Sequence, residues 1–123
     1  MDFNASAREQ IAWLSSGNIT SLELLNAYIL RMEEKNPAIN AIVAKDIDGA
    51  RQAAQEFDRK RSNGEDIGPL QGLPITVKDS YDVAGLPAVC GVPRLTKRDA
   101  NVADAEVVKS VRLAGGVVWG KTN

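Results

Sequence analysis

Apolar residues recur at helical intervals in the first half of the chain and predict three helices. The first begins at a capping-box sequence, Ser6-Ala7-Arg8-Glu9, and ends at Gly17. The second begins at another capping box in residues 20–23 and ends at Asn36-Pro37. Its apolar stripe consists of Leu22, Leu25, Ile29 and Met32. Residues 1–37 are therefore predicted to be helical.

The third helix has small side chains on its inner face. Its stripe, Ala50, Ala53, Ala54 and Phe57, predicts close packing against the next layer. The opposite face is expected to point to solvent and carries Arg51, Gln55, Asp58 and Arg59. Residues 59–66 are polar and predict an exposed loop.

Three short apolar runs are candidate strands. The first spans residues 39–44. The second follows Pro74, which lacks an N–H donor, so its hydrogen-bonded part is predicted at residues 75–77. The third spans residues 117–119. Turn-rich sequence follows the second strand, and a fourth helix precedes the third. We expect Asp104 to cap that helix, Gly115-Gly116 to end it, and its inner face to consist of Val107, Val108, Val111 and Ala114.

A strand, an irregular crossover, a helix and a strand together indicate an α/β protein with a parallel sheet. Only two or three strands are predicted, and a sheet that small leaves edges free to pair. We therefore interpret residues 38–123 as the start of an α/β core belonging to a larger fold. Pairing of two copies through the exposed sheet edge is a further expectation.

Composition narrows the function classes. The 123 residues include 15 basic and 16 acidic side chains, so a net charge of −1 suggests neither nucleic acid nor an anionic membrane as partner. A small molecule or another protein is the expected partner. The single cysteine, the lack of a long apolar run and the absence of a signal-like amino terminus predict a cytoplasmic location.

The chain contains no histidine. Catalysis by Ser-His-Asp or Cys-His sets is thereby excluded for these residues, and most zinc sites with it. Proton transfer would fall to a carboxylate or a lysine. Lys78 is the candidate, because it follows a predicted strand at the edge where α/β sheets collect ligands. A lysine acts as a base only when neutral, which burial or a nearby cation favours, and we expect Val77 to help bury it.

Two neighbours of Lys78 suggest other chemistry. Ser80 can share a face with Lys78 and form a Ser-Lys dyad, although a turn serine is the simpler interpretation. Cys90 with Lys78 and a glutamate would form a Cys-Glu-Lys set, but no surrounding motif supports it. We interpret Cys90 as a small core or loop residue.

Residues 115–122, from Gly115 to Thr122, match the phosphate-loop pattern G-x-x-x-x-G-K-[ST]. That loop must follow a strand and open a helix, leaving backbone N–H groups free for phosphate. Here the first glycine ends a predicted helix, and Val-Val-Trp favours a strand. A phosphate-binding domain therefore remains only a minor alternative.

Residues 68–79, Gly-Pro-Leu-Gln-Gly-Leu-Pro-Ile-Thr-Val-Lys-Asp, followed by residues 82–87, Asp-Val-Ala-Gly-Leu-Pro, strongly resemble the lysine segment of the amidase signature family. Residues 104–123 resemble the segment that follows it, and residues 20–41 resemble its amino-terminal region. The resemblance implies an α/β/α fold with a mixed, largely parallel central sheet, no cofactor or metal, and a small amide as substrate.

The resemblance also implies a mechanism. In this family a lysine, a serine in a cis peptide and a nucleophilic serine form the catalytic triad, and Lys78 takes the place of the lysine. Both serines and the glycine-rich oxyanion loop are expected downstream of residue 123. We therefore expect this polypeptide alone to be inactive. A non-catalytic interaction module is the alternative function.

Overall fold

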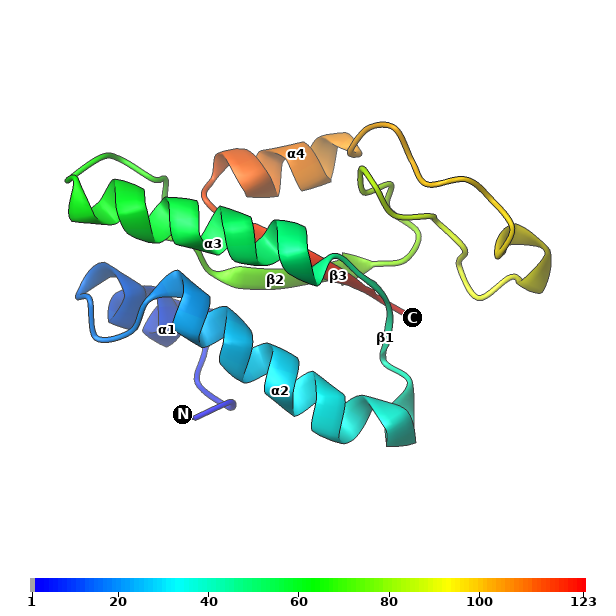
Figure 1. Ribbon diagram of the computed structural model, residues 1–123, viewed down its shortest axis with the longest axis horizontal. Helices are drawn as coiled ribbons and strands as arrows, with labels where there is room; N and C mark the ends of the chain where they lie inside the picture. The colour runs from blue at the N-terminus through cyan, green and yellow to red at the C-terminus, as the bar shows by residue number, and fades with distance from the viewer. Residues whose placement is uncertain (1) are drawn as a thin grey trace.

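In the computed structural model, residues 2–123 form four α-helices, one 3₁₀ helix and three strands (Figure 1). The α-helices are α1 (Ala7–Ser15), α2 (Ser21–Ile39), α3 (Ile47–Ser62) and α4 (Glu106–Leu113). The strands are β1 (Ile42–Lys45), β2 (Pro74–Lys78) and β3 (Val117–Thr122), and the 3₁₀ helix η1 covers Pro93–Leu95. The predicted mixture of helices and strands is confirmed.

The sheet is mixed and has the order β1-β3-β2. The central strand β3 pairs in parallel with β2 and antiparallel with β1. The parallel pair confirms the predicted crossover, because antiparallel hairpins need no such connection. In its register with β2, β3 carries one extra residue, Trp119, between Val118 and Gly120. Such a bulge changes which face the following side chains occupy.

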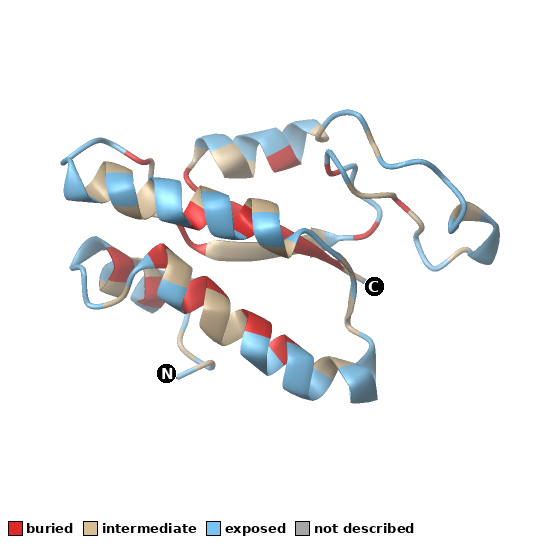
Figure 2. Cartoon of the chain, viewed as in Figure 1, coloured by how far each residue is buried: buried red, intermediate tan, exposed pale blue. Residues whose placement is uncertain are grey.

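Helices cover both faces of the sheet (Figures 1 and 2). Val117 and Trp119 of β3 pack against Leu25 and Ile29 of α2 and Ala50 of α3. A second cluster holds Val77, Val108 and Val118 together and therefore places α4 on the opposite face. The buried positions in Figure 2 concentrate along β3 and the facing sides of the helices. The core thus fixes the two strands whose carboxyl ends carry the candidate site.

Both predicted capping boxes are confirmed. Ser6 caps α1 and Thr20 caps α2, each in reciprocal hydrogen bonds with the glutamate three residues later. The hydroxyl and then the backbone N–H of Ser6 lower the pKa of Glu9. The backbone N–H and then the hydroxyl of Thr20 lower the pKa of Glu23. These contacts satisfy N–H groups that a helix start leaves without partners.

Several predicted boundaries are wrong by a few residues. Helix α2 continues through Pro37 to Ile39 and ends at Asn40 in the left-handed conformation (φ 47°). Pro37 lies in the last turn of α2, so its missing N–H removes one hydrogen bond near the end of the helix and leaves the earlier turns intact. Helix α3 likewise runs to Ser62, so the first half of the predicted loop, residues 59–62, is helical.

Two predicted roles in α4 are also wrong. Asp104 does not cap the helix, because its carboxylate accepts hydrogen bonds from the Ala84 N–H (2.8 Å) and the Arg112 Nε (2.9 Å). Ala105 stands at the cap position without a side-chain bond. Val107 is 47% exposed, whereas Val108 is fully buried. The side chain of Asp104 thus joins the start of α4 to the preceding loop.

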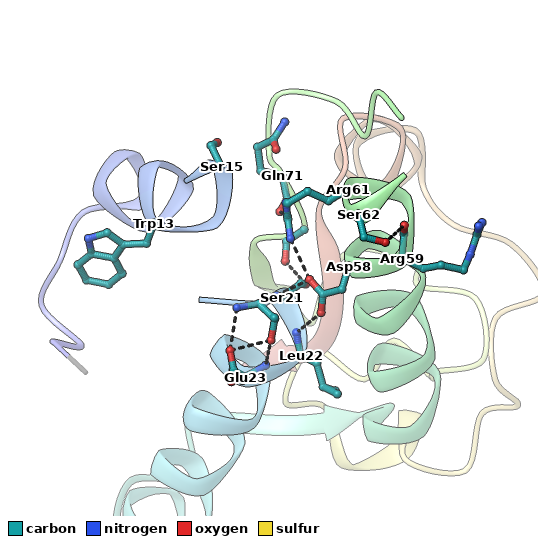
Figure 3. A network of polar contacts seen from close by, with 12 residues as sticks. Trp13, Ser15, Ser21, Leu22, Glu23, Asp58, Arg59, Arg61, Ser62 and Gln71 are labelled. Carbon is teal, nitrogen blue, oxygen red and sulfur yellow. Dashed lines mark hydrogen bonds and ion pairs between the residues drawn. The ribbon is translucent and has the colours of Figure 1, made fainter. Parts of the chain in front are cut away.

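Asp58, predicted on the solvent face of α3, instead contacts the start of α2 (Figure 3). Its two carboxylate oxygens accept hydrogen bonds from the N–H groups of Ser21 (2.7 Å) and Leu22 (3.0 Å). Arg61 forms an ion pair with Asp58 at 2.9 Å and also donates to the Gln71 carbonyl. This network joins α2, α3 and the turn that leads into β2. Sequence reasoning missed it because the partners are about forty residues apart.

Candidate functional site

Lys78 is the last residue of β2 and lies beside Thr122 of β3 in the sheet register. Its side chain is exposed, so the expectation that Val77 would help bury it is wrong. Val77 belongs to the apolar cluster under α4, and successive strand residues point to opposite faces. Within residues 2–123, no carboxylate forms an ion pair with Lys78. Its ammonium is therefore not committed to a structural contact with an acid.

Asp79, the next residue, is engaged elsewhere. Its carboxylate is 2.9 Å from the Nζ of Lys121, and the exposed fractions of the two side chains are 4% and 0%. Lys121 also donates a hydrogen bond to the Pro87 carbonyl at 2.7 Å. The backbone N–H of Asp79 donates to the Thr122 carbonyl at 2.8 Å. A buried ion pair thus joins the ends of the two parallel strands.

The segment that leaves β2 folds back onto this pair. We call residues 79–92 the crossover loop. The second carboxylate oxygen of Asp79 accepts hydrogen bonds from the N–H groups of Cys90 (2.8 Å) and Val89 (3.3 Å). Cys90 has a positive φ of 53°, followed by Gly91 at 67°. Successive backbone N–H groups in a turn can bind an anion, and here those of Val89 and Cys90 bind the Asp79 carboxylate.

Ser80 and Cys90 match their non-catalytic interpretations, a turn serine and a loop cysteine. Ser80 is exposed in a turn closed by the Tyr81 N–H and the Lys78 carbonyl (3.0 Å). The structure gives it no hydrogen bond with the Lys78 side chain. Cys90 is an exposed loop cysteine whose thiol lies 3.8 Å from the Asp79 carbonyl. Neither residue forms a catalytic pair among residues 2–123.

A cleft of about 380 Å³ opens at this edge of the sheet. The crossover loop contributes Asp79, Pro87, Val89 and Gly91 to its lining. Val43 of β1 and Asn123, which follows β3, line the other side. Ligands of open α/β sheets bind outside the carboxyl ends of the parallel strands. The cleft lies at that edge and is bordered by the residue that directly follows Lys78.

Lys121 occupies the lysine position of the phosphate-loop pattern but has a structural contact instead. Residues 117–122 are a strand, and Gly115 ends α4 with a φ of 88°. The Val117 N–H is bonded to the Leu73 carbonyl (2.9 Å), so it is not free for phosphate. We therefore expect millimolar ATP with magnesium to leave the melting temperature of the chain unchanged. A rise in Tm would contradict this expectation, because a ligand that binds the folded state stabilises it.

The sequence contains a signal for the role of Lys121. A lysine that continues an apolar strand run must be buried unless the strand ends before it, and a buried lysine needs an acid partner. Asp79 is the acid that ends the neighbouring parallel strand. Residues 2–123 bring no three metal-ligating side chains together, and no helix among them is long and apolar enough to cross a bilayer.

The fold and cleft define an α/β protein with a candidate site at the carboxyl edge of a mixed sheet. The chain belongs to the amidase family, whose sequence model matches residues 23–123. It is 41% identical to an acylamidase of Rhodococcus erythropolis over 118 residues, which are 96% of this chain and 24% of that protein. It is 38% identical to an indoleacetamide hydrolase of Bradyrhizobium diazoefficiens, covering 96% of this chain and 22% of that protein.

Solved structures agree with the sequence comparison. A bacterial aryl acylamidase of the amidase signature family superposes with a TM-score of 0.87 at 29% identity, covering 97% of this chain and 25% of that one. The expected amidase-signature fold is thereby confirmed. The chain spans about a quarter of the length of the relatives it matches.

Proposed function

We propose that residues 1–123 form the amino-terminal portion of an amide hydrolase and supply its general base, Lys78. The position of Lys78 carries the proposal: it is the last residue of β2, directly precedes Asp79 of the cleft lining, and pairs with no carboxylate of residues 2–123. The family match supports the reaction class. The other lysine at this edge, Lys121, is fully buried against Asp79 and cannot reach a substrate.

The proposed chemistry is acyl transfer through serine. Lys78 is exposed in residues 2–123, so the following sequence is proposed to cover it and favour its neutral form. Neutral Lys78 then removes a proton through a relay serine, and the nucleophilic serine attacks the amide carbonyl. The resulting oxyanion is held by backbone N–H groups until ammonia or an amine leaves with a proton. Water then hydrolyses the acyl-enzyme to a carboxylic acid. Both serines are proposed to lie in the sequence that follows residue 123 in this family.

The test compares two polypeptides. The first is the species that carries this sequence in its source cells, captured with an antibody against residues 1–123 and measured by intact mass. The second is the 123-residue chain alone. We expect the native species to be several times heavier than 13.2 kDa and to release acid from a panel of aliphatic and aryl amides. The chain alone is expected to release none, because triad residues act as a unit.

The opposite result favours a second function. Large apolar side chains are exposed on several elements: Ile39 is 67% exposed, Leu113 is 85% exposed and Val102 is 100% exposed. Strands β1 and β2 each have a free edge in this sheet. Exposed apolar surface and open edges suit a non-catalytic interaction module. A native species near 13.2 kDa that self-associates in light scattering would support that function and contradict the hydrolase proposal.

A further inference from the structure

We propose that Lys121 is a positioning residue that holds the crossover loop against the ends of β2 and β3 and so builds the wall of the cleft. In calling this cleft part of an active site, the inference rests on the proposed function of Lys78. The loop-holding role itself concerns residues within this chain. It gives a specific role to Lys121, which occupies the lysine position of the phosphate-loop pattern.

The contacts of Lys121 converge on the crossover loop at two separated points. Its ammonium contacts the Asp79 carboxylate at the beginning of the loop and the Pro87 carbonyl further along. Asp79 extends the connection to the N–H groups of Val89 and Cys90. One buried cation thus reaches both sides of the loop, directly or through a single carboxylate.

Three residues of the ion-pair network also line the cleft. Asp79, Pro87 and Val89 all contact the ion pair and all line the cavity. A buried ion pair is weak evidence for stability, because apolar residues of similar volume often stabilise a fold as well or better. An apolar pair would leave the Pro87 carbonyl and the two loop N–H groups without these partners. The geometry therefore assigns the pair to loop position.

The ion pair lies on the face of the sheet opposite to Lys78. Asp79 and Lys78 are adjacent in sequence. Lys121 neutralises the Asp79 carboxylate on the side of the sheet where Val77 packs. Lys78 is on the opposite face by strand alternation. The Lys121–Asp79 pair and the Lys78 side chain therefore belong to opposite faces of the sheet.

The test uses amide hydrogen exchange in the full chain, followed residue by residue with NMR. In Lys121→Met we expect the Val89 and Cys90 amides to exchange about tenfold faster or more, because their acceptor is no longer fixed. The Val117 amide, which bonds to Leu73 away from the loop, is the internal reference and should stay within about twofold. The matched control is Lys97→Met, an exposed lysine, which should change neither.

A purely structural role would give a different pattern. If Lys121 only stabilised the whole fold, the Val117 and Cys90 amides would lose protection together. That result, or unchanged protection at both, overturns the proposal. Since an unpaired buried Asp79 can prevent folding of the single variant, the double variant Asp79→Asn/Lys121→Met removes both charges. It should fold and lose protection selectively in the crossover loop. Wild-type protection in that variant also overturns the proposal.

Hydrogen exchange requires no substrate, so this outcome is independent of the catalytic assignment. If Lys78→Ala keeps full turnover in the native polypeptide while Lys121→Met raises exchange only in the crossover loop, the proposed base is wrong and the positioning role stands. If Lys78→Ala is inactive and the loop amides are unaffected by Lys121→Met, the base stands and the positioning role fails.

Discussion

Lys78→Ala is expected to lower kcat for amide hydrolysis at least about 10³-fold in the native polypeptide that carries this sequence. The reason is the loss of the group that removes the proton from the nucleophile. Lys78 contributes no ion pair within residues 2–123, so the variant should keep its melting temperature. The measurement is initial rate against amide concentration, which separates kcat from KM. The control is Lys45→Ala, an exposed lysine at the end of β1.

Lys78→Arg distinguishes a base from a cation. Arginine retains the positive charge but does not lose its proton in proteins, so it cannot act as a base. We expect Lys78→Arg to be as inactive as Lys78→Ala. If the arginine variant keeps most of the rate, Lys78 binds substrate through its charge, and the proposed proton transfer is contradicted. Full activity in Lys78→Ala would remove Lys78 from the site altogether.

Local signals account for the parts of this fold that the sequence predicts. A capping box lies within four residues, so the sequence around Ser6 and Thr20 predicts the starts of α1 and α2 directly. The buried run at residues 117–119 likewise indicated β3, and it extends to Thr122. The motif at residues 68–79 located Lys78 at a strand end. Each inference needed only neighbouring residues and their periodicity.

Long-range polar pairing accounts for what the sequence did not reveal. Helical spacing predicts a solvent-facing position for Asp58, opposite the alanine stripe of α3, yet its carboxylate accepts hydrogen bonds from N–H groups of α2. Lys121 matched a known pattern, yet its partner Asp79 lies on another strand. The exposure of Lys78 was not predicted either, because burial of a strand residue depends on which elements pack over its face of the sheet. Such partners follow from the three-dimensional arrangement and not from local periodicity.

Asp58→Ala is expected to lower the free energy of unfolding by about 2–4 kcal/mol. The substitution leaves the Ser21 and Leu22 N–H groups at the start of α2 without their acceptor. It also deprives Arg61 of its ion-pair partner. Because Asp58 is about one-fifth exposed (19%), water recovers part of the loss, which keeps the estimate below that for a fully buried charge. Urea unfolding monitored by circular dichroism measures the change.

Asp48→Ala is the matched control for that measurement. Asp48 is an exposed aspartate in the first turn of the same helix, so its loss should cost at most about 1 kcal/mol through the helix dipole. Asp58→Asn keeps one acceptor oxygen and should give an intermediate loss. If Asp58→Ala costs no more than Asp48→Ala, the network in Figure 3 does not hold α2 in place. Asp58 does not line the cleft and is expected to affect stability, whereas Lys78 is expected to affect the catalytic rate. Asp58→Ala should therefore keep the wild-type kcat in the folded fraction. Lys78→Ala should keep the wild-type unfolding midpoint.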